Sequence, residues 1–287
     1  MRLKQKIVTI LGLITACLFC AQPSPGYIPI GEHILDLMVS HLGNTRGFYV
    51  THATVTGVSG CVASANNGIE GKSWFKLPGM FRSEWSTGES KSKKIYVSSP
   101  EGALTIVGNK IVATGESDLM LYKEPLLFRD RNELVARLTN GLGIDASVSS
   151  LGRMDDKVAY VVGANYPDLS VSQLWVDKKT FLPLRLLVKQ NNNGSTIEAR
   201  YFKWRKTGRV WFPMRIEVYR DNQPIYTICS RDVREKGSFG SRFFDINSMK
   251  QSYRTAEDPY GEKAHKKKNK DDEIQETIED FKKLYGK

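Results

Sequence analysis

The sequence contains few cysteines and few histidines for its length. Four cysteines in 287 residues are too few for a disulfide scaffold. The histidines are scattered, and no two of them have the spacing of metal ligands; they are His33, His41, His52 and His265. A Gly-x-Ser-x-Gly motif and a glycine-rich phosphate loop are also absent. We therefore expect a protein that is not an enzyme and that carries no metal and no cofactor.

Long apolar runs are missing after the N-terminus, where none approaches the roughly 20 residues that span a bilayer. Hydrophobic residues make up 40% of the chain and charged residues 25%, which allows a sizeable core and excludes disorder throughout. Acidic residues are outnumbered, 31 against 42 basic residues, for a net charge of +11. This balance indicates nucleic acid or anionic lipid as partner classes and does not choose between them.

Residues 1–20 have the features of an export signal. Basic residues come first, and an uncharged apolar run follows over 7–16. The run ends in Ile14-Thr15-Ala16-Cys17, which resembles a bacterial lipobox and predicts lipidation at Cys17. A plain secreted form and an uncleaved buried segment are the alternatives. The expected location is the bacterial cell envelope, in the periplasm and anchored to the outer membrane, and this address excludes nucleic acid as a partner.

Export also bears on the remaining cysteines. Past the signal only Cys61 and Cys229 remain, and an oxidising compartment permits a disulfide between them. Two separate buried thiols are the alternative. Residues 21–29 are rich in proline and are predicted to be a tether.

Apolar periodicity divides the rest of the chain into helix, strands, helix and strands. Spacing of three and four residues predicts a helix over 30–42, with His33 and His41 facing solvent. Within 123–142 a second helix is expected after a capping pair, Asp130 and Glu133. Period-two runs predict a first block of strands at 47–57, 68–77, 79–87, 93–98, 103–108 and 110–114.

A second block of strands is separated by short, turn-rich connections, so neighbouring strands should form antiparallel hairpins. The runs are 145–153, 157–164, 172–177, 181–189, 195–205, 209–220 and 224–234. Asp155 and Asp156 lie between two of these runs and are interpreted as turn formers. Pro213 in the middle of a run favours an edge position or a bulge.

The C-terminal stretch has a different composition. Residues 257–287 are predicted to be a charged linker followed by an amphipathic helix, which leaves 30–256 as the folded domain. The lysine-rich run 266–270 is either a solvated linker or a contact with anionic lipid headgroups. The helix either docks on the protein surface or binds a membrane or a protein partner.

These elements predict a mainly β (α+β) fold, in which a curved antiparallel sheet or unclosed β-barrel is covered on its concave side by helices. Because such a sheet has more inner face than three short helices can fill, we expect an apolar cavity. Its predicted lining consists of bulky apolar residues of the second block: Trp175, Leu184, Leu186, Phe212, Met214 and Ile216. The alternative is that these residues form solid core.

Three segments have a recognisable pattern. Residues 174–185 read as a strand, an Asp turn and a Leu-Pro strand, residues 200–219, with Gly208 and Phe212-Pro213, as the next hairpin, and 243–246 as a closing Phe-Asp segment. These segments resemble the LolA/LolB-like lipoprotein-localisation superfamily, which includes the N-terminal domain of RseB-type periplasmic sensors. The resemblance implies an unclosed antiparallel barrel with a helical lid over a cavity that receives acyl chains. This chain departs from that family in two ways. Soluble LolA-type carriers have no lipobox, and the linker and tail helix of this chain extend past the usual end of the family's domain.

The sequence therefore favours a non-enzymatic envelope protein that binds lipid acyl chains or lipoproteins, of the outer-membrane lipoprotein-sorting type. The alternative is an RseB-like periplasmic lipid sensor that acts through a protein partner at the C-terminal helix. A third hypothesis is an envelope hydrolase with an unrecognised site.

Overall fold

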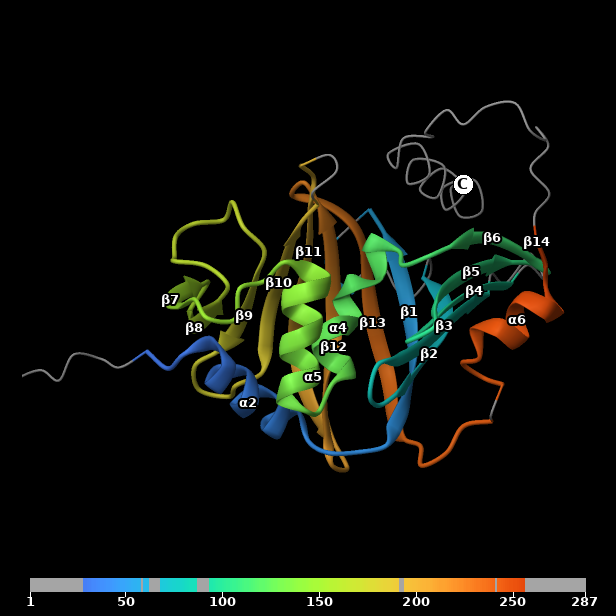
Figure 1. Ribbon diagram of the computed structural model, residues 1–287, viewed down its shortest axis with the longest axis horizontal. Helices are drawn as coiled ribbons and strands as arrows, with labels where there is room; N and C mark the ends of the chain where they lie inside the picture. The colour runs from blue at the N-terminus through green and yellow to red at the C-terminus, as the bar shows by residue number, and fades with distance from the viewer. Residues whose placement is uncertain are drawn as a thin grey trace, which may run out of the picture.

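The computed structural model describes residues 28–57, 59–61, 68–86, 93–190, 194–240 and 242–255. These residues form one sheet of 14 strands in the order β14-β6-β5-β4-β3-β2-β1-β13-β12-β11-β10-β9-β8-β7 (Figure 1). Neighbouring strands are antiparallel, apart from β14, which pairs in parallel with β6. Because β14 and β7 are the two edges, the sheet does not close on itself. The predicted mainly β, unclosed architecture is confirmed.

The alternation of apolar residues places the strands close to their predicted positions. The first block contains β1 (Gly47–Thr56), β2 (Ile69–Lys76), β3 (Met80–Ser86), β4 (Lys93–Ser99), β5 (Gly102–Val107) and β6 (Lys110–Thr114). The second contains β7 (Ser149–Met154), β8 (Lys157–Val162), β9 (Gln173–Asp177), β10 (Pro183–Lys189), β11 (Thr196–Thr207), β12 (Val210–Arg220) and β13 (Gln223–Glu235), and β14 (Arg254–Thr255) follows. β1 pairs with both β2 and β13, which joins the two blocks into one sheet. The Asp155-Asp156 turn between β7 and β8 is confirmed.

Helical segments cover the concave face of the sheet (Figure 1). They are α2 (Gly31–Leu42), η1 (Asp118–Lys123), α4 (Glu124–Leu127), α5 (Arg131–Ala136) and η2 (Arg137–Gly141). The segment from η1 to η2, residues 118–141, is called the lid below. Asp130 caps α5 as predicted, because its carboxylate accepts hydrogen bonds from the backbone N–H groups of Asn132 and Glu133 at 2.8 and 3.0 Å. His33 and His41 on α2 are exposed, as predicted.

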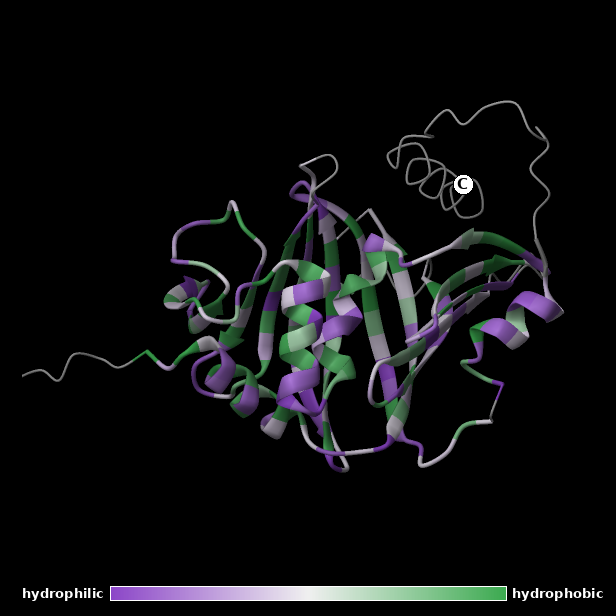
Figure 2. Ribbon diagram, viewed as in Figure 1, coloured by the Kyte–Doolittle hydropathy of each residue, from purple (hydrophilic) through white to green (hydrophobic). Residues whose placement is uncertain are grey.

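The main core lies between the concave face and these helices. Its centre is aromatic: Phe48 stacks on Phe75 with ring centroids 4.5 Å apart, and Phe212 meets both rings edge-on at 5.5 and 5.6 Å. These rings come from β1, β2 and β12, so they connect the two strand blocks. Figure 2 shows hydrophobic and hydrophilic residues alternating along the strands, as a sheet with one buried face requires.

A second apolar cluster lies on the opposite face of the first strand block. There α6 (Ile246–Ser252), which the sequence analysis did not predict, packs Ile246 and Met249 against Val97 and Ile106. Among the described residues, no helix is both long and apolar enough to cross a membrane. The expected signal 1–20 with Cys17, the tether up to residue 27, and the linker and helix of 257–287 lie outside the described residues.

Candidate functional site

The lid presents an apolar underside to the sheet. Its buried side chains belong to the same core cluster as the concave strand residues; they are Leu119, Leu121, Tyr122, Leu126, Leu127, Leu134 and Leu138. Arg129 joins the lid to α2, because its Nε donates to the carbonyl of Gly43 at 2.6 Å. Since both surfaces are apolar, lifting the lid would expose a continuous apolar surface along the strands.

Two tyrosines of the sheet hold the lid by its backbone. The hydroxyl of Tyr201 on β11 donates to the carbonyl of Tyr122 at 2.8 Å, and the hydroxyl of Tyr226 on β13 donates to the carbonyl of Leu119. Burial raises the pKa of both Tyr201 and Tyr226 well above the ordinary value, so both phenols stay protonated and can donate. The 3-10 turn of the lid is thereby fixed to the middle of the sheet.

Charged side chains link the helical segments of the lid to one another. Lys123 and Glu124 are each 2% exposed and form an ion pair, and Arg137 donates from Nε to Glu124 Oε2 at 2.7 Å. Burial alone would lower the pKa of Lys123, but the Glu124 carboxylate raises it above its usual value. Burial would raise the pKa of Glu124, but Lys123 and Arg137 hold it below its usual value. Both groups are therefore charged, and each depends on the other.

A polar chain lies in the sheet beneath the lid. His52 Nε2 is 2.9 Å from Ser73 Oγ, which is 2.7 Å from Ser83 Oγ, and Thr54 Oγ1 is 3.4 Å from His52 Nδ1. Burial, reinforced by the positive charge of Arg231, lowers the pKa of His52 from 6.5 to about 4. In a serine hydrolase, a neutral imidazole in contact with a serine hydroxyl acts as the general base and the serine as the nucleophile. His52 has no carboxylate among its hydrogen-bond partners in the described residues, so the orienting group of a catalytic triad is not in place.

The six residues predicted to line a cavity lie on both faces of the sheet. Leu186, Phe212 and Ile216 are buried in the main core beneath the lid, and Met214, partly buried, packs against the same cluster. Trp175 and Leu184 lie on the other face, in a small cluster with Ala159, Val161 and Ala164.

Two local features of the backbone explain this division. Trp175 alternates with Leu174 and Val176, and those two side chains are the ones that enter the main core. The pairing of β10 with β9 shifts between Pro183 and Arg185, which turns Leu184 away from the face of Leu186. The prediction that Trp175 and Leu184 line the same face as Leu186 is therefore wrong.

The expected cavity is filled by side chains. Phe212 and Ile216 line a void of about 10 Å³, together with residues that include His52, Ser73 and Tyr122. That volume is at the lower limit for one water molecule and far below the size of an acyl chain. The leucines and Tyr122 of the lid occupy the space beneath it. In this structure the concave face is closed, and ligand would have to displace the lid.

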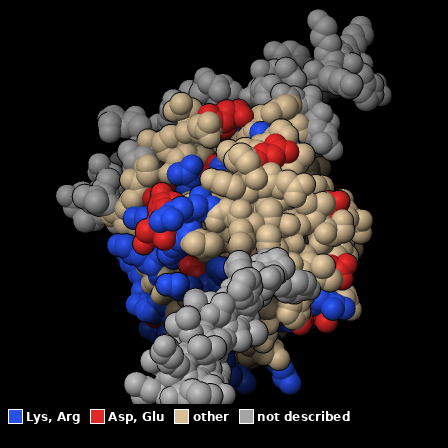
Figure 3. Space-filling model, turned by 90° about the vertical axis from the view of Figure 1, so that its left-hand side faces the viewer, with Lys and Arg blue, Asp and Glu red and all other residues tan. Residues whose placement is uncertain are grey.

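The outer face of β10–β12 is polar and charged. Glu198, which is 2% exposed, binds Arg185 Nη2 at 2.7 Å and also pairs with Arg200. The guanidinium of Arg200 lies 4.4 Å from the ring centre of Tyr219. Figure 3, which views the molecule from the side of the β7 edge, shows lysine and arginine gathered on one flank with acidic residues among them. This charged face contrasts with the apolar face under the lid.

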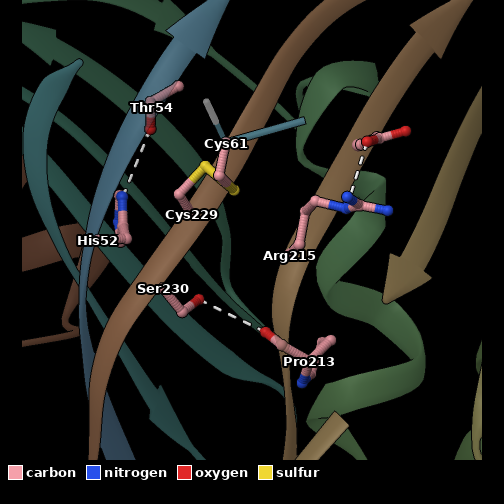
Figure 4. Close-up of a disulfide and its surroundings, with 8 residues drawn as sticks. His52, Thr54, Cys61, Pro213, Arg215, Cys229 and Ser230 are labelled. Carbon is pink, nitrogen blue, oxygen red and sulfur yellow. Dashed lines mark hydrogen bonds and ion pairs between the residues drawn. A yellow bond between two sulfur atoms is a disulfide. The ribbon is translucent and has the colours of Figure 1, made fainter. Parts of the chain in front are cut away.

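A disulfide joins Cys61, which follows β1, to Cys229 on β13 (Figure 4). The S–S distance is 2.14 Å, and the two residues are 168 positions apart in the sequence. The bridge lies beside Arg215 of β12, so it is on the charged face and not under the lid (Figure 4). Of the two alternatives that the sequence left open, the structure has the bridge.

Sequence reasoning missed the ion pair within the lid and the tyrosine contacts that join the lid to the sheet. The ion pair had a signal, because Lys123 and Glu124 are adjacent opposite charges between apolar residues that must be buried. The tyrosine contacts had none, because their carbonyl acceptors lie 79 and 107 positions away in the chain. In the described residues, no group of three or more His, Cys, Asp or Glu side chains gathers at a metal-binding distance.

Comparison with known proteins gives a likeness of fold. No family model and no curated protein matches the sequence. Among solved structures, a LolA superfamily protein from Nitrosomonas europaea matches with 13% identity and a TM-score of 0.44, covering 77% of this chain and 100% of its own.

Two further solved structures are similar at the same level. A DUF1329 family protein from Desulfovibrio piger has 14% identity, coverage of 77% and 100%, and a TM-score of 0.41. A putative outer membrane lipoprotein-sorting protein domain from Vibrio parahaemolyticus has 10% identity, coverage of 76% and 97%, and a TM-score of 0.41. The Nitrosomonas europaea protein belongs to the superfamily that this sequence resembles. The likeness to all three structures is one of fold alone.

Proposed function

We propose that the protein is a non-enzymatic binder of lipid acyl chains or lipoproteins in the bacterial cell envelope, of the outer-membrane lipoprotein-sorting type. One observation carries this proposal: the lid and the concave sheet face meet through an apolar interface that belongs to a single core cluster. An acyl chain between them would contact the same strand residues that now contact the lid leucines.

The energetics favour exchange between a closed and a loaded state. Opening the lid exposes apolar surface, which costs about 25 cal/mol per Å². An acyl chain that enters regains about 0.8 kcal/mol for each CH₂ removed from water. The free energy gained by burying the acyl chain therefore offsets the cost of exposing the apolar surface under the lid. The hydrogen bonds of Tyr201 and Tyr226 favour the closed state. A protein with this balance can take up a chain and release it to a membrane.

The envelope location is supported by two independent features. The Cys61–Cys229 disulfide is typical of an oxidising compartment. The lipobox-like segment before Cys17 would supply a lipid anchor. Labelled palmitate should enter the wild type and Cys20→Ser but not Cys17→Ser. Equal labelling of all three proteins would contradict lipidation at Cys17.

The test of the whole proposal is lipid extraction and mass spectrometry of the purified mature protein. We expect acyl lipids or lipoproteins in the extract, at a higher level than from an unrelated envelope protein purified in parallel. A fluorescent fatty acid offered to the delipidated protein should also bind. An extract without lipid, together with no fatty-acid binding, would contradict the proposal.

The RseB-like alternative differs by requiring a protein partner. Deleting 257–287 distinguishes the two functions. A sensor would keep its lipid and lose an envelope protein that copurifies with the full chain. A carrier would keep its lipid with no partner to lose.

A further inference from the structure

A second hollow lies on the opposite face of the sheet from the lid. It has a volume of about 850 Å³, which is within the usual range for small-ligand sites. Three parts of the chain form its walls: Arg82 of β3, the β5–β6 turn with Lys110, and α6 with the loop before it, including Arg242. Figure 1 shows α6 beside β4–β6, far from the β7 edge. We call this hollow the α6 groove.

The charged residues of the α6 groove are all basic. They are Arg82, Lys110 and Arg242, and among the described residues no aspartate or glutamate lines the groove. Lys110 and Arg242 are exposed, and neither has an ion-pair partner among the described residues. Their two positive charges are therefore uncompensated within the part of the chain that the structure describes.

Arg82 has a different role in the α6 groove, because it is buried and fixed. Its Nε and Nη2 contact Glu84 Oε1 at 2.8 and 2.6 Å, and its Nη1 donates to the carbonyl of Phe243 at 3.0 Å. The guanidinium also lies 4.5 Å from the ring centre of Phe243. Glu84, which also pairs with Lys93, offsets part of its charge. Arg82 therefore gives the groove a rigid base, and Lys110 and Arg242 add exposed positive charge.

Polar groups without charge complete the lining. Asn109, Ser248, Ser252 and Tyr253 line the same space. The Ser252 hydroxyl donates to the carbonyl of Ser248 at 2.8 Å, which leaves its oxygen as an acceptor. Val107 and Met249 add apolar surface to the lining. A ligand that fits must be anionic, able to accept several hydrogen bonds, and compact enough to lie between a hairpin turn and one helix.

We propose that the α6 groove binds a phosphate group. A phosphate offers several acceptor oxygens around one centre, which suit the charges of Lys110 and Arg242 and the hydroxyls of Ser248 and Tyr253, whereas the Ser252 hydroxyl already donates to Ser248. The phosphate belongs either to a lipid headgroup at a membrane surface or to a free phosphate compound. This site is separate from the proposed acyl-chain site, because the sheet lies between them.

The test uses the full mature protein and a charge-matched control. Sodium phosphate is titrated calorimetrically at constant ionic strength, and cosedimentation is measured with vesicles of phosphatidylglycerol and with vesicles of phosphatidylcholine. The test variant is Lys110→Gln with Arg242→Gln. The control is Lys178→Gln with Lys179→Gln, which removes the same charge from the exposed β9–β10 turn. The test variant should bind phosphate or anionic vesicles at least tenfold more weakly, and the control should stay within twofold of wild type.

Each result has a defined meaning. Binding to phosphatidylglycerol vesicles but not to sodium phosphate assigns the headgroup as the source, and the reverse assigns a free phosphate compound. No binding of either probe by the wild type would overturn the proposal. Equal weakening in the test variant and the control would also overturn it, because that is the behaviour of net charge alone. The acyl-lipid content of the test variant should equal that of wild type, which keeps this result distinct from the proposed function.

Discussion

The hydroxyl of Tyr201 on β11 donates a hydrogen bond to the backbone carbonyl of Tyr122 in the lid, at a distance of 2.8 Å. The two residues are 79 positions apart, and both are buried. The contact is between a side chain of the sheet and the backbone of the lid, so it is made only when the lid is closed. Tyr226 makes the corresponding contact with Leu119. These hydrogen bonds define the closed state chemically, and they can be removed without changing the apolar surfaces.

We expect Tyr201→Phe and Tyr226→Phe each to lower the free energy of unfolding by about 1–2 kcal/mol, because each leaves a buried lid carbonyl without its donor. Urea denaturation measures this change. Amide hydrogen exchange over 118–127 should become faster in both variants, and uptake of a fluorescent fatty acid should accelerate. Tyr166→Phe is the control, because Tyr166 is 45% exposed. Unchanged exchange in the lid would contradict its attachment by these hydroxyls.

The pH dependence of stability should carry the signature of His52. Its pKa is about 4 in the folded protein and 6.5 as an ordinary histidine, so the unfolded chain binds the proton more readily between these values. The free energy of unfolding should therefore fall as the pH is lowered from about 6.5 to about 4, with no further loss from this residue below that. The difference corresponds to about 3 kcal/mol.

Denaturation of His52→Gln between pH 4 and 7 isolates this contribution from that of the carboxylates. The variant should lose most of the histidine-dependent slope. His33→Gln is the matched control, because it changes an exposed histidine of α2. Identical slopes for wild type and His52→Gln would show that His52 does not titrate as a buried group.

The disulfide should stabilise the fold mainly by restricting the unfolded chain. Cys61 and Cys229 are 168 positions apart, so the bridge closes a long loop, for which a contribution of about 2–4 kcal/mol is typical. The double variant Cys61→Ser, Cys229→Ala should be less stable than the oxidised wild type by this amount, measured in urea. A reducing agent should weaken the wild type and leave the variant unchanged. A variant as stable as oxidised wild type would contradict a structural role for the bridge.

The strands could be predicted from the sequence because their signal is local. Val210, Phe212, Ile216 and Val218 share one face of the 209–220 run, whose other face is mixed, and β12 lies where that alternation predicted. The capping of α5 by Asp130 was equally local. The position of Leu184 could not be predicted in the same way, because the register shift between β9 and β10 depends on how two strands pair.

The filled cavity has a similar explanation. The area of the inner sheet face can be estimated from strand number, but the space left above it depends on how the lid side chains pack. The leucines of η1 and α4 and the ring of Tyr122 take up that space, and nothing in their spacing indicates the depth to which they reach. The tyrosine contacts that set this depth join residues distant in the sequence.

Met214→Arg tests whether the concave face takes up acyl chains. Met214 is partly buried and packs against the main core, whereas its neighbours Phe212 and Ile216 are 2% and 0% exposed. An arginine at 214 can keep its guanidinium near solvent while its stem stays on the apolar surface, so we expect the protein to fold with a loss of about 1–3 kcal/mol. In the loaded state the same charge lies among acyl chains, where it is costly. Copurified lipid should fall to background.

A matched control for this charge is Val158→Arg, which places an arginine on β8 at a position that is 43% exposed. This variant should keep the full lipid load and the wild-type melting temperature. A thermal melt and lipid mass spectrometry of the two variants then decide between the interpretations. A folded Met214→Arg protein that retains all of its lipid would refute the assignment of this face to acyl chains. An unfolded Met214→Arg protein would show that residue 214 is part of solid core, and fatty-acid uptake by the Tyr201→Phe variant would then carry the test, because that change adds no charge to the apolar surface.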